Sequence, residues 1–275
     1  MDEMVVKANG AEIPAIGLGT WQLRGEEGAA AVKSALEAGY RHIDTAAMYG
    51  NEEAVGEGLR ASGVARDEVF VTTKVWPEDL APADLRRSAE ASLKRLGLSQ
   101  VDLLLIHWPN AAIPLAGTIR ALCEAKRAGL SRHIGVANFT VRLLDEAVSL
   151  ADEPIVANQC EYHPYLDQSL VRAECRKHGA AFVSYCPIGK AQVLSEPAIQ
   201  AIAKAHRRTP AQIVLRWQVQ QPGVVAIPKS GDPQRQRENF SVFDFGLTDE
   251  EMAAICGLAR PGGRMVTPAW SPHWD

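Results

Sequence analysis

Short apolar runs rich in β-branched residues alternate with longer helical patterns along this chain of 275 residues. Eight such runs occur, at residues 16–21, 42–46, 69–75, 101–107, 133–138, 155–162, 181–188 and 224–230. The runs are nearly continuous in apolar residues, as expected for parallel strands that are buried on both faces. Eight βα units of this length predict an α/β fold of the (β/α)8 TIM-barrel type. We expect an N-terminal β-hairpin over residues 5–13 to close the bottom of the barrel.

Residues that typically start or stop a helix lie between the runs and support this alternation. In the stretch after the third run, Pro82 suits a first helical turn and Gly97 suits a stop. The apolar residues between them fall on one helical face, namely Leu85, Ala89, Leu93 and Leu96. We also expect helices that begin near Asn51 and Thr140. Because no linker, repeat or charge block interrupts the pattern, we expect a single domain over residues 1–275.

An open, doubly wound parallel sheet is the alternative fold. Eight evenly spaced units are more than such a sheet usually needs. Its dinucleotide-binding fingerprint is also incomplete, because the first turn has only Gly17 and Gly19 and opens a loop rather than a helix. The barrel is therefore the favoured fold.

Composition excludes several classes of partner. A net charge of −4 and a pI near 6.0 give no general attraction to nucleic acid or to an anionic membrane. The five cysteines form no CxxC pair and no zinc spacing, and a scattered, odd set of thiols suits a reducing compartment. The chain shows neither a signal-type apolar run nor an apolar stretch long enough to span a bilayer. We therefore expect a soluble cytoplasmic protein.

Four residues of complementary chemistry follow three successive strands of the predicted barrel. Asp44, Lys74 and His107 stand at the ends of the second, third and fourth runs, and Tyr49 lies in the loop after the second. In a barrel these strand ends meet at one mouth, where active sites are built. A neighbouring ammonium such as Lys74 favours the phenolate of Tyr49, and Asp44 could keep Lys74 protonated and aimed. Such a group could protonate a carbonyl oxygen, with His107 donating a hydrogen bond or sharing the proton transfer.

Each of these residues also has an ordinary structural interpretation. Asp44 and Lys74 could form an ion pair at the barrel rim, His107 could be a satisfied core imidazole, and Tyr49 could be a half-buried loop residue. Two other functions remain open: a non-catalytic barrel that only binds a cofactor, and a metal-dependent barrel hydrolase. The ligands of the hydrolase would come from His42, Asp44, Lys74, His107 and His163. This set of ligands is not self-consistent, because Asp44 cannot both pair with Lys74 and bind a metal ion.

A series of ordered motifs resembles one known family. Residues 44–52 read DTAAMYGNE, 73–76 read TKVW, 107–109 read HWP and 135–139 read GVANF. Residues 227–230 read IPKS and are followed by Arg235, Glu238 and Asn239. In these motifs the chain resembles the aldo-keto reductases over essentially its whole length.

This resemblance implies an oxidoreductase that uses NADPH to reduce a small-molecule carbonyl, with Asp44, Tyr49, Lys74 and His107 as the catalytic residues. Tyr49 would be the general acid. The resemblance assigns the nicotinamide carboxamide to Asn138 and Gln159, ring stacking to Tyr185, and the pyrophosphate to the backbone of residues 184–189. It also assigns the 2′-phosphate to Lys229 and Arg235. The full set of cofactor residues it implies is Gly19, Thr20, Trp21, Asp44, Asn138, Gln159, Tyr185, Cys186, Pro187, Ile188, Gly189, Lys229, Ser230, Arg235, Glu238 and Asn239. No metal ligand is expected.

Two positions depart from the family pattern. Ala137 stands where a serine usually precedes Asn138, which removes one hydrogen bond to the carboxamide, at a cost of about 1 kcal/mol. Asp232 stands near the expected adenosine phosphate, and with Pro233 it reads as a helix N-cap followed by proline at the first position. Because a carboxylate near a phosphate is unfavourable, we hypothesise that NADH can also be used.

The substrate side is expected to be aromatic and open. Trp21, Trp76 and Trp108 follow strands one, three and four and should line the pocket together with Tyr49 and His107. The segment at 270–275 and the loop at 110–114 are short, so the pocket should accept small polar carbonyls.

Within the family the chain is most similar to the bacterial 2,5-diketo-D-gluconate reductases of the B type, which also reduce methylglyoxal. The trimmed loops, residues 122–130 and residues 272–275 carry this similarity. We also expect a monomer, although the sequence does not give the oligomeric state. The physiological substrate stays open.

Overall fold

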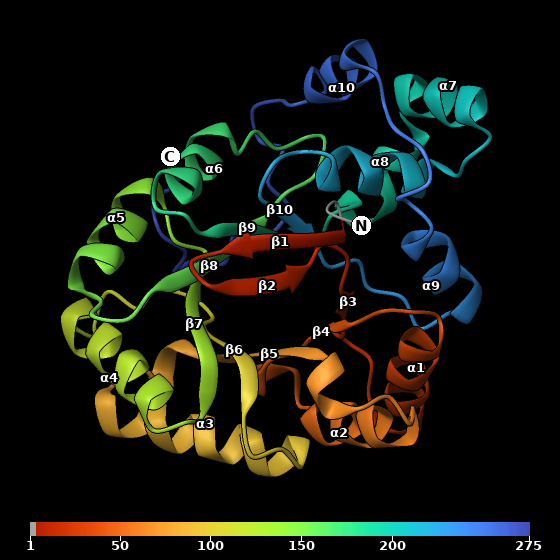
Figure 1. Ribbon diagram of the computed structural model, residues 1–275. Coiled ribbons are helices and arrows are strands. Elements are labelled where there is room, and N and C mark those ends of the chain that lie inside the picture. The colour runs from red at the N-terminus through yellow and green to blue at the C-terminus, as the bar shows by residue number, and fades with distance from the viewer. Residues whose placement is uncertain (1–3) are drawn as a thin grey trace.

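The computed structural model describes residues 4–275, and its centre is a barrel of eight parallel strands with helices outside it (Figure 1). Neighbouring strands in the sheet follow one another along the chain. They are β3 (Leu18–Gly19), β4 (His42–Asp44), β5 (Phe70–Val75), β6 (Val101–Ile106), β7 (Ser131–Ala137), β8 (Ile155–Glu161), β9 (Ala181–Tyr185) and β10 (Val224–Ala226).

The first and last strands close the barrel. Parallel bridges join Ile16, just before β3, to Ala226 at the end of β10, and Gly19 at the end of β3 to Lys229, just after β10. Within this seam the amide of Gly17 donates to the carbonyl of Ala226 at 2.9 Å. The predicted (β/α)8 barrel is therefore confirmed.

Helices cover the outside of the strands (Figure 1). The helices of the eightfold pattern are α1 (Gly25–Glu37), α2 (Glu52–Ala61), α3 (Pro82–Leu96), α4 (Leu115–Arg127), α5 (Val141–Leu150), α6 (Ser169–Lys177), α8 (Pro210–Val219) and α9 (Pro233–Phe240). Two further helices are α7 (Pro197–His206) and α10 (Asp249–Cys256), and short 3-10 turns are η2 (Ala47–Tyr49), η3 (Arg66–Glu68), η4 (Pro77–Asp79) and η5 (Gly189–Ser195). None of the helices in residues 4–275 is both long and apolar enough to cross a membrane.

Local sequence signals explain where these helices begin and end. The predicted punctuation of α3 is confirmed, since Pro82 opens the helix and Gly97 ends it in the left-handed conformation. Thr140 caps α5 by accepting a hydrogen bond from the amide of Leu143. Asn51 directly precedes α2, as expected.

Most strands end a few residues earlier than the apolar runs indicate. The seventh run extends to Ile188, but β9 ends at Tyr185 because Cys186 adopts a positive φ of 55°. The eighth run extends to Ser230, whereas β10 ends at Ala226. Apolar residues thus continue beyond the paired segments into the loops of the mouth.

The N-terminal hairpin closes the bottom of the barrel, as predicted. Strands β1 (Val5–Ala8) and β2 (Ala11–Pro14) pair in antiparallel fashion around Asn9 and Gly10, both of which have positive φ. The hairpin contributes Ala8, Ala11 and Ile13 to the apolar cluster inside the barrel. The amide of Asn9 donates to the carbonyl of Ile155, the first residue of β8.

We expect Ile13→Ala to destabilise the protein by about 2–5 kcal/mol, because Ile13 is fully buried and its loss leaves a cavity. Urea unfolding measures this change. Glu12→Ala on the exposed face of the same strand should change the free energy of unfolding by less than about 0.5 kcal/mol. Equal effects of the two substitutions would contradict a stabilising role for the hairpin at the bottom of the barrel.

Candidate active site

The four residues predicted to be catalytic come together at the carboxyl ends of β4, β5 and β6. Asp44 is the last residue of β4, Lys74 is in β5, and His107 follows β6 directly. Tyr49 ends η2, the single turn after β4. The ammonium of Lys74 lies 2.6 Å from Oδ1 of Asp44 and 3.4 Å from the hydroxyl of Tyr49. The predicted juxtaposition is therefore present.

Lys74 and Asp44 form a buried ion pair in which both partners have further hydrogen bonds. Lys74 is 0% exposed and Asp44 is 1% exposed. Lys74 also donates to the carbonyl of Thr45 at 2.8 Å, and the second oxygen of Asp44 accepts from Nε2 of Gln159 at 2.7 Å. Burial alone would lower the pKa of Lys74, but Asp44 and Tyr49 outweigh it and the pKa is raised. Lys74 therefore carries its charge at neutral pH.

Tyr49 holds its proton more firmly than the sequence suggested. Burial raises the pKa of Tyr49 above its ordinary value of 10.0, although the Lys74 ammonium pulls it down. The expected influence of Lys74 is thus present but smaller than the cost of burying a phenolate. Tyr49 is a protonated phenol at neutral pH, with an ammonium next to the oxygen that would lose the proton.

His107 is a neutral imidazole beside Tyr49. Their ring centroids are 5.7 Å apart. Burial, helped by the charge of Lys74, lowers the pKa of His107 well below its ordinary value of 6.5. Within residues 4–275 its buried Nδ1 has no hydrogen-bond partner. The ring can therefore act as an uncharged hydrogen-bond donor.

The residues after Tyr49 fix the loop that carries it. The side-chain amide of Asn51 donates to the carbonyls of Thr20 and Leu23, and its oxygen accepts from the hydroxyl of Thr45. Glu52 is buried and accepts from Thr73 on β5. Sequence reasoning assigned neither residue a role, although both stand in the DTAAMYGNE motif.

The residues predicted to hold the nicotinamide carboxamide line the same mouth. Asn138 has a positive φ of 62°, and its oxygen accepts from the hydroxyl of Tyr185 at 2.8 Å. Its amide donates to the carbonyl of His107, and its backbone N–H donates to the carbonyl of Gln159. Because Gln159 also contacts Asp44, the candidate cofactor residues and the candidate catalytic residues share one network.

The segment predicted to wrap the pyrophosphate, residues 184–189, has an unusual backbone together with the two residues that follow it. Cys186, Gly189, Lys190 and Ala191 all have φ between 51° and 68°. Left-handed conformations cost non-glycine residues free energy and cluster at ligand-binding loops. Pro187 is held by Gln218, which donates to its carbonyl at 3.1 Å. Ile188 leads into η5.

The first strand and its loop form another side of the mouth. Gly19 pairs with Asp44 between β3 and β4, and the amide and hydroxyl of Thr20 both donate to the carbonyl of Asp44. Trp21 stands edge to face against Tyr49, with ring centroids 4.9 Å apart. The three predicted residues of this loop therefore border the catalytic cluster.

The residues predicted for the 2′-phosphate lie around the start of α9. Lys229 and Arg235 are exposed, whereas Ser230 and Asn239 are buried and Glu238 accepts from Gln234. Asp232 is the N-cap that the sequence predicted, and its Oδ1 accepts from the amides of Gln234 and Arg235 at 2.8 and 3.0 Å. Its carboxylate therefore accepts hydrogen bonds from two of the amides that the first turn of the helix leaves without a backbone partner.

Aromatic rings extend the mouth above the catalytic cluster. Trp76 stands edge to face against His107 at 5.1 Å. The structure also places Trp270 against both Trp76 and Trp108, at 5.7 and 5.3 Å. Trp274 also contacts Trp108, which is consequently almost fully buried. Trp270 thus joins two of the tryptophans predicted to line the pocket.

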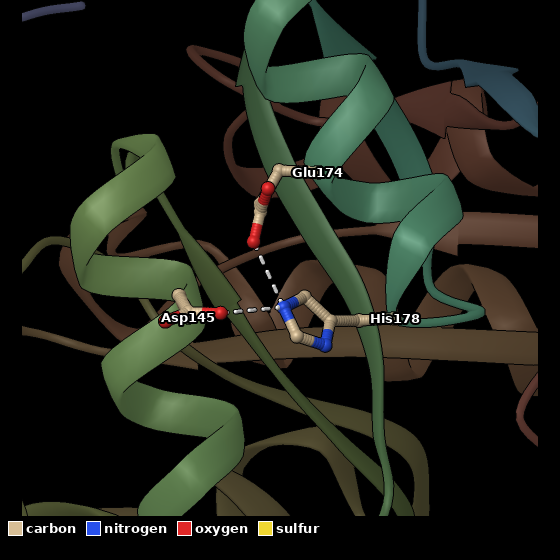
Figure 2. Close-up of side chains that lie close together, drawn as sticks. All are labelled: Asp145, Glu174 and His178. Atoms are coloured by element: carbon tan, nitrogen blue, oxygen red, sulfur yellow. Dashed lines mark hydrogen bonds and ion pairs between the residues drawn. The ribbon is translucent and has the colours of Figure 1, made fainter.

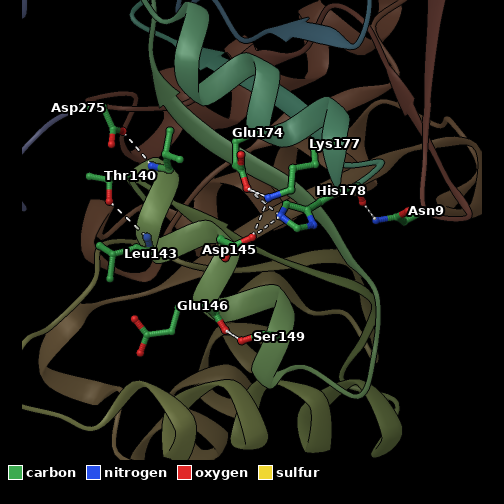
Figure 3. A network of polar contacts seen from close by, with 11 residues as sticks. Asn9, Thr140, Leu143, Asp145, Glu146, Ser149, Glu174, Lys177, His178 and Asp275 are labelled. Carbon is green, nitrogen blue, oxygen red and sulfur yellow. Dashed lines mark hydrogen bonds and ion pairs between the residues drawn. The ribbon is translucent and has the colours of Figure 1, made fainter.

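The alternative set of metal ligands is not assembled. His42 faces Thr72 and Pro14, away from the mouth, and His163 pairs with Glu161. In residues 4–275, the only group of His, Cys, Asp and Glu spaced for a metal is Asp145, Glu174 and His178, on α5 and at the end of α6 (Figure 2). Lys177 already donates to both carboxylates of that group (Figure 3). This cluster therefore reads as an ion-pair network between two helices.

Comparison with known proteins gives a consistent match. Residues 15–260 match the Aldo/keto reductase family. The 2,5-diketo-D-gluconic acid reductase B of Corynebacterium sp. is 45% identical over 89% of this chain and 88% of its own. The glyoxal reductase of Bacillus subtilis is 43% identical over 92% and 91%.

A solved structure is similar along almost its full length. The crystal structure of an aldo-keto reductase from Bombyx mori in complex with NADP has a TM-score of 0.89 to this chain. The two are 36% identical, and the match covers 96% of this chain and 95% of the other. Both the fold and the family resemblance seen in the motifs are therefore confirmed.

We expect Lys74→Met to destabilise the fold by about 3–5 kcal/mol, because Asp44 would remain buried without its counter-ion. The double variant Asp44→Asn/Lys74→Met should recover about 1–3 kcal/mol of that loss, since it leaves no unpaired charge. Urea unfolding at pH 7 measures both.

Lys177→Met is the matched control, because it removes an exposed lysine from two carboxylates and should cost less than about 1 kcal/mol. Strict additivity of the Asp44 and Lys74 substitutions would show that the buried pair is not coupled.

Proposed function

The chain belongs to the aldo/keto reductase family and is an NAD(P)H-dependent oxidoreductase, and we propose that it reduces small aldehydes and ketones to alcohols with Tyr49 as the general acid. The contact of the Lys74 ammonium with both Asp44 and the Tyr49 hydroxyl is the observation that carries this proposal. A positive charge therefore lies next to the phenol oxygen, where it can stabilise the phenolate that forms when Tyr49 gives up its proton.

The residues at the mouth fit a nicotinamide cofactor. Two amide side chains, Asn138 and Gln159, and the ring of Tyr185 lie next to the catalytic cluster. A backbone with positive φ follows at Cys186, and exposed cations stand at Lys229 and Arg235. These groups match the polar, aromatic and phosphate parts of NADPH in that order. When bound, NADPH supplies a hydride to the carbonyl carbon.

The protein's own groups manage the proton and the charge. The Tyr49 hydroxyl donates its proton to the carbonyl oxygen as negative charge builds there. The Lys74 ammonium stabilises the phenolate that remains, and Asp44 keeps that ammonium charged and oriented. The 3.4 Å from Lys74 to Tyr49 is long for a hydrogen bond, as is common before substrate is bound.

His107 orients the substrate rather than protonating it. Its neutral ring can donate a hydrogen bond to the carbonyl oxygen without supplying a second acidic proton. The rings of Trp21 and Trp76 border this point, and Trp270 packs against Trp76.

Small, polar carbonyl compounds are the proposed substrates. The names of the relatives from Corynebacterium and Bacillus refer to a diketo acid and to glyoxal. Trp21 is 43% exposed and Trp270 is 51% exposed, so the aromatic wall leaves the mouth open to solvent. We propose substrates of the 2,5-diketo-D-gluconate or methylglyoxal type.

We further propose that the protein acts as a cytoplasmic monomer. All four catalytic candidates come from one chain. The cysteines are free thiols, as a reducing compartment would leave them.

We expect Tyr49→Phe to lower kcat for methylglyoxal by about 10²–10⁴-fold while the Kd for NADPH changes less than about twofold. NADPH oxidation at 340 nm and cofactor titration measure the two quantities. Tyr162→Phe removes a buried hydroxyl that contacts Gln221 and Arg172 in the outer layer, and it should leave kcat unchanged. Turnover of Tyr49→Phe at the wild-type rate would overturn the assigned mechanism. Turnover of the wild-type protein should also survive EDTA, which excludes the metal-dependent alternative.

We propose weak discrimination between NADPH and NADH, because the Asp232 carboxylate occupies the N-terminus of α9 beside the candidate phosphate site. Asp232→Ser should raise the ratio of kcat/KM values for NADPH and NADH about tenfold, or about 1.4 kcal/mol. Asp249→Ser, in the exposed first turn of α10, is the control that should leave the ratio unchanged. A wild-type ratio in the thousands, or a ratio unmoved by Asp232→Ser, would refute this proposal.

A further inference from the structure

Residues 264–275, which we call the strap, carry Trp270 and Trp274 onto the aromatic wall of the mouth. The strap has no helix or strand of its own, so its position depends on side-chain contacts with the barrel. Asp275 accepts from the amide of Val141 at the start of α5 (Figure 3). Within the strap itself, the guanidinium of Arg264 lies 3.6 Å from the ring centroid of Trp274.

One fully buried carboxylate holds the other end of the strap. Glu161 accepts from the amide of Met265 at 2.6 Å and from the amide of Val266 at 2.9 Å. Its Oε1 also accepts from Nε2 of His163 at 2.8 Å, which fixes the orientation of the carboxylate. Glu161 is 0% exposed, so these three donors replace the water that a carboxylate otherwise requires.

The position of Glu161 in the barrel explains why it can reach the strap. It is the last residue of β8 and stands two residues after Gln159. Residues two apart in a strand point to the same face, so Glu161 stands above the amide that contacts Asp44. Asp44 and the strap are therefore both held by side chains from one short stretch of β8.

The same part of the strap also contacts the segment proposed to wrap the cofactor. Lys190 donates to the carbonyl of Met265 at 3.2 Å. A Cβ at Gly189 would approach the side chain of Met265 within 3.3 Å and that of His163 within 3.5 Å. Met265 is thus fixed between Glu161 and the loop after β9.

We propose that Glu161 is a positioning residue for substrate binding: by holding the backbone of Met265 and Val266, it sets the place of Trp270 in the wall of the carbonyl pocket. This inference rests on the proposed carbonyl reduction. Glu161 does not touch the reacting atoms, so its effect falls on the affinity for substrate and not on proton transfer.

Glu161→Gln tests this role, because the three donors share two carboxylate oxygens, whereas an amide has only one oxygen that accepts. We expect KM for methylglyoxal to rise about tenfold, the equivalent of one lost charge-assisted hydrogen bond. We expect kcat at saturating substrate and the Kd for NADPH to change less than about twofold, because the four proposed catalytic residues are untouched. Hydrogen exchange of the strap amides in the free protein should accelerate.

A double-mutant cycle with Trp270→Ala separates positioning from general stability. If Glu161 acts through Trp270, Glu161→Gln adds no further rise in KM once Trp270 is absent. Asp102→Asn is the matched control: Asp102 is also a buried carboxylate that accepts a backbone amide, from Val71 at the start of β5. This variant should lower the melting temperature without changing KM.

Additive effects on KM, unchanged exchange of the strap, or a parallel loss of kcat and cofactor affinity would overturn the positioning role. Failure of the proposed function looks different. A wild-type protein without NADPH-dependent turnover would refute carbonyl reduction, whereas the hydrogen-exchange result would still report whether Glu161 holds the strap.

Discussion

The buried ion pair of Lys74 and Asp44 is the interaction on which the barrel mouth depends. Two charges away from water are tolerated only if their geometry is good and their remaining polar atoms are satisfied. Thr45 and Gln159 meet this requirement. Since β8, which carries Gln159, lies four strands from β4 in an eight-stranded barrel, the contact with Asp44 crosses the interior. This hydrogen bond therefore links opposite sides of the barrel at the point where chemistry is proposed.

The same burial sets the protonation state of the groups around the pair. It raises the pKa of Tyr49 and lowers the pKa of His107, so both are uncharged at neutral pH while Lys74 is charged. An acid that keeps its proton until a carbonyl accepts it, next to a cation that stabilises its conjugate base, follows from this arrangement. Neighbouring charge alone would have given a different balance, because it acts against the larger effect of desolvation on Tyr49.

Much of the fold and of the proposed catalytic cluster could be predicted from the sequence, because both follow from periodicity. Strand runs imply a barrel, and a barrel brings strand ends such as Asp44 and Lys74 together. The ends of the strands were less predictable, because apolar residues such as Ile188 continue beyond the pairing. The net pKa shift of Tyr49 depends on burial, and the contact of Trp270 depends on the path of a segment without regular structure. Neither leaves a periodic pattern.

Glu161 illustrates why such residues escape a sequence-based search. Its partners on the strap are backbone amides, which every residue except proline possesses, so Met265 and Val266 carry no signature of the contact. In the sequence Glu161 is one acidic residue at the end of an apolar strand. Its contact with the strap becomes visible only in the folded structure, where the end of β8 lies next to Met265 and Val266. Because Glu161 contacts the backbone of Met265 and Val266, this attachment does not require particular side chains at these two positions. The proposed catalytic cluster has less freedom, since the contacts of Lys74 with Asp44 and Tyr49 both require particular side chains.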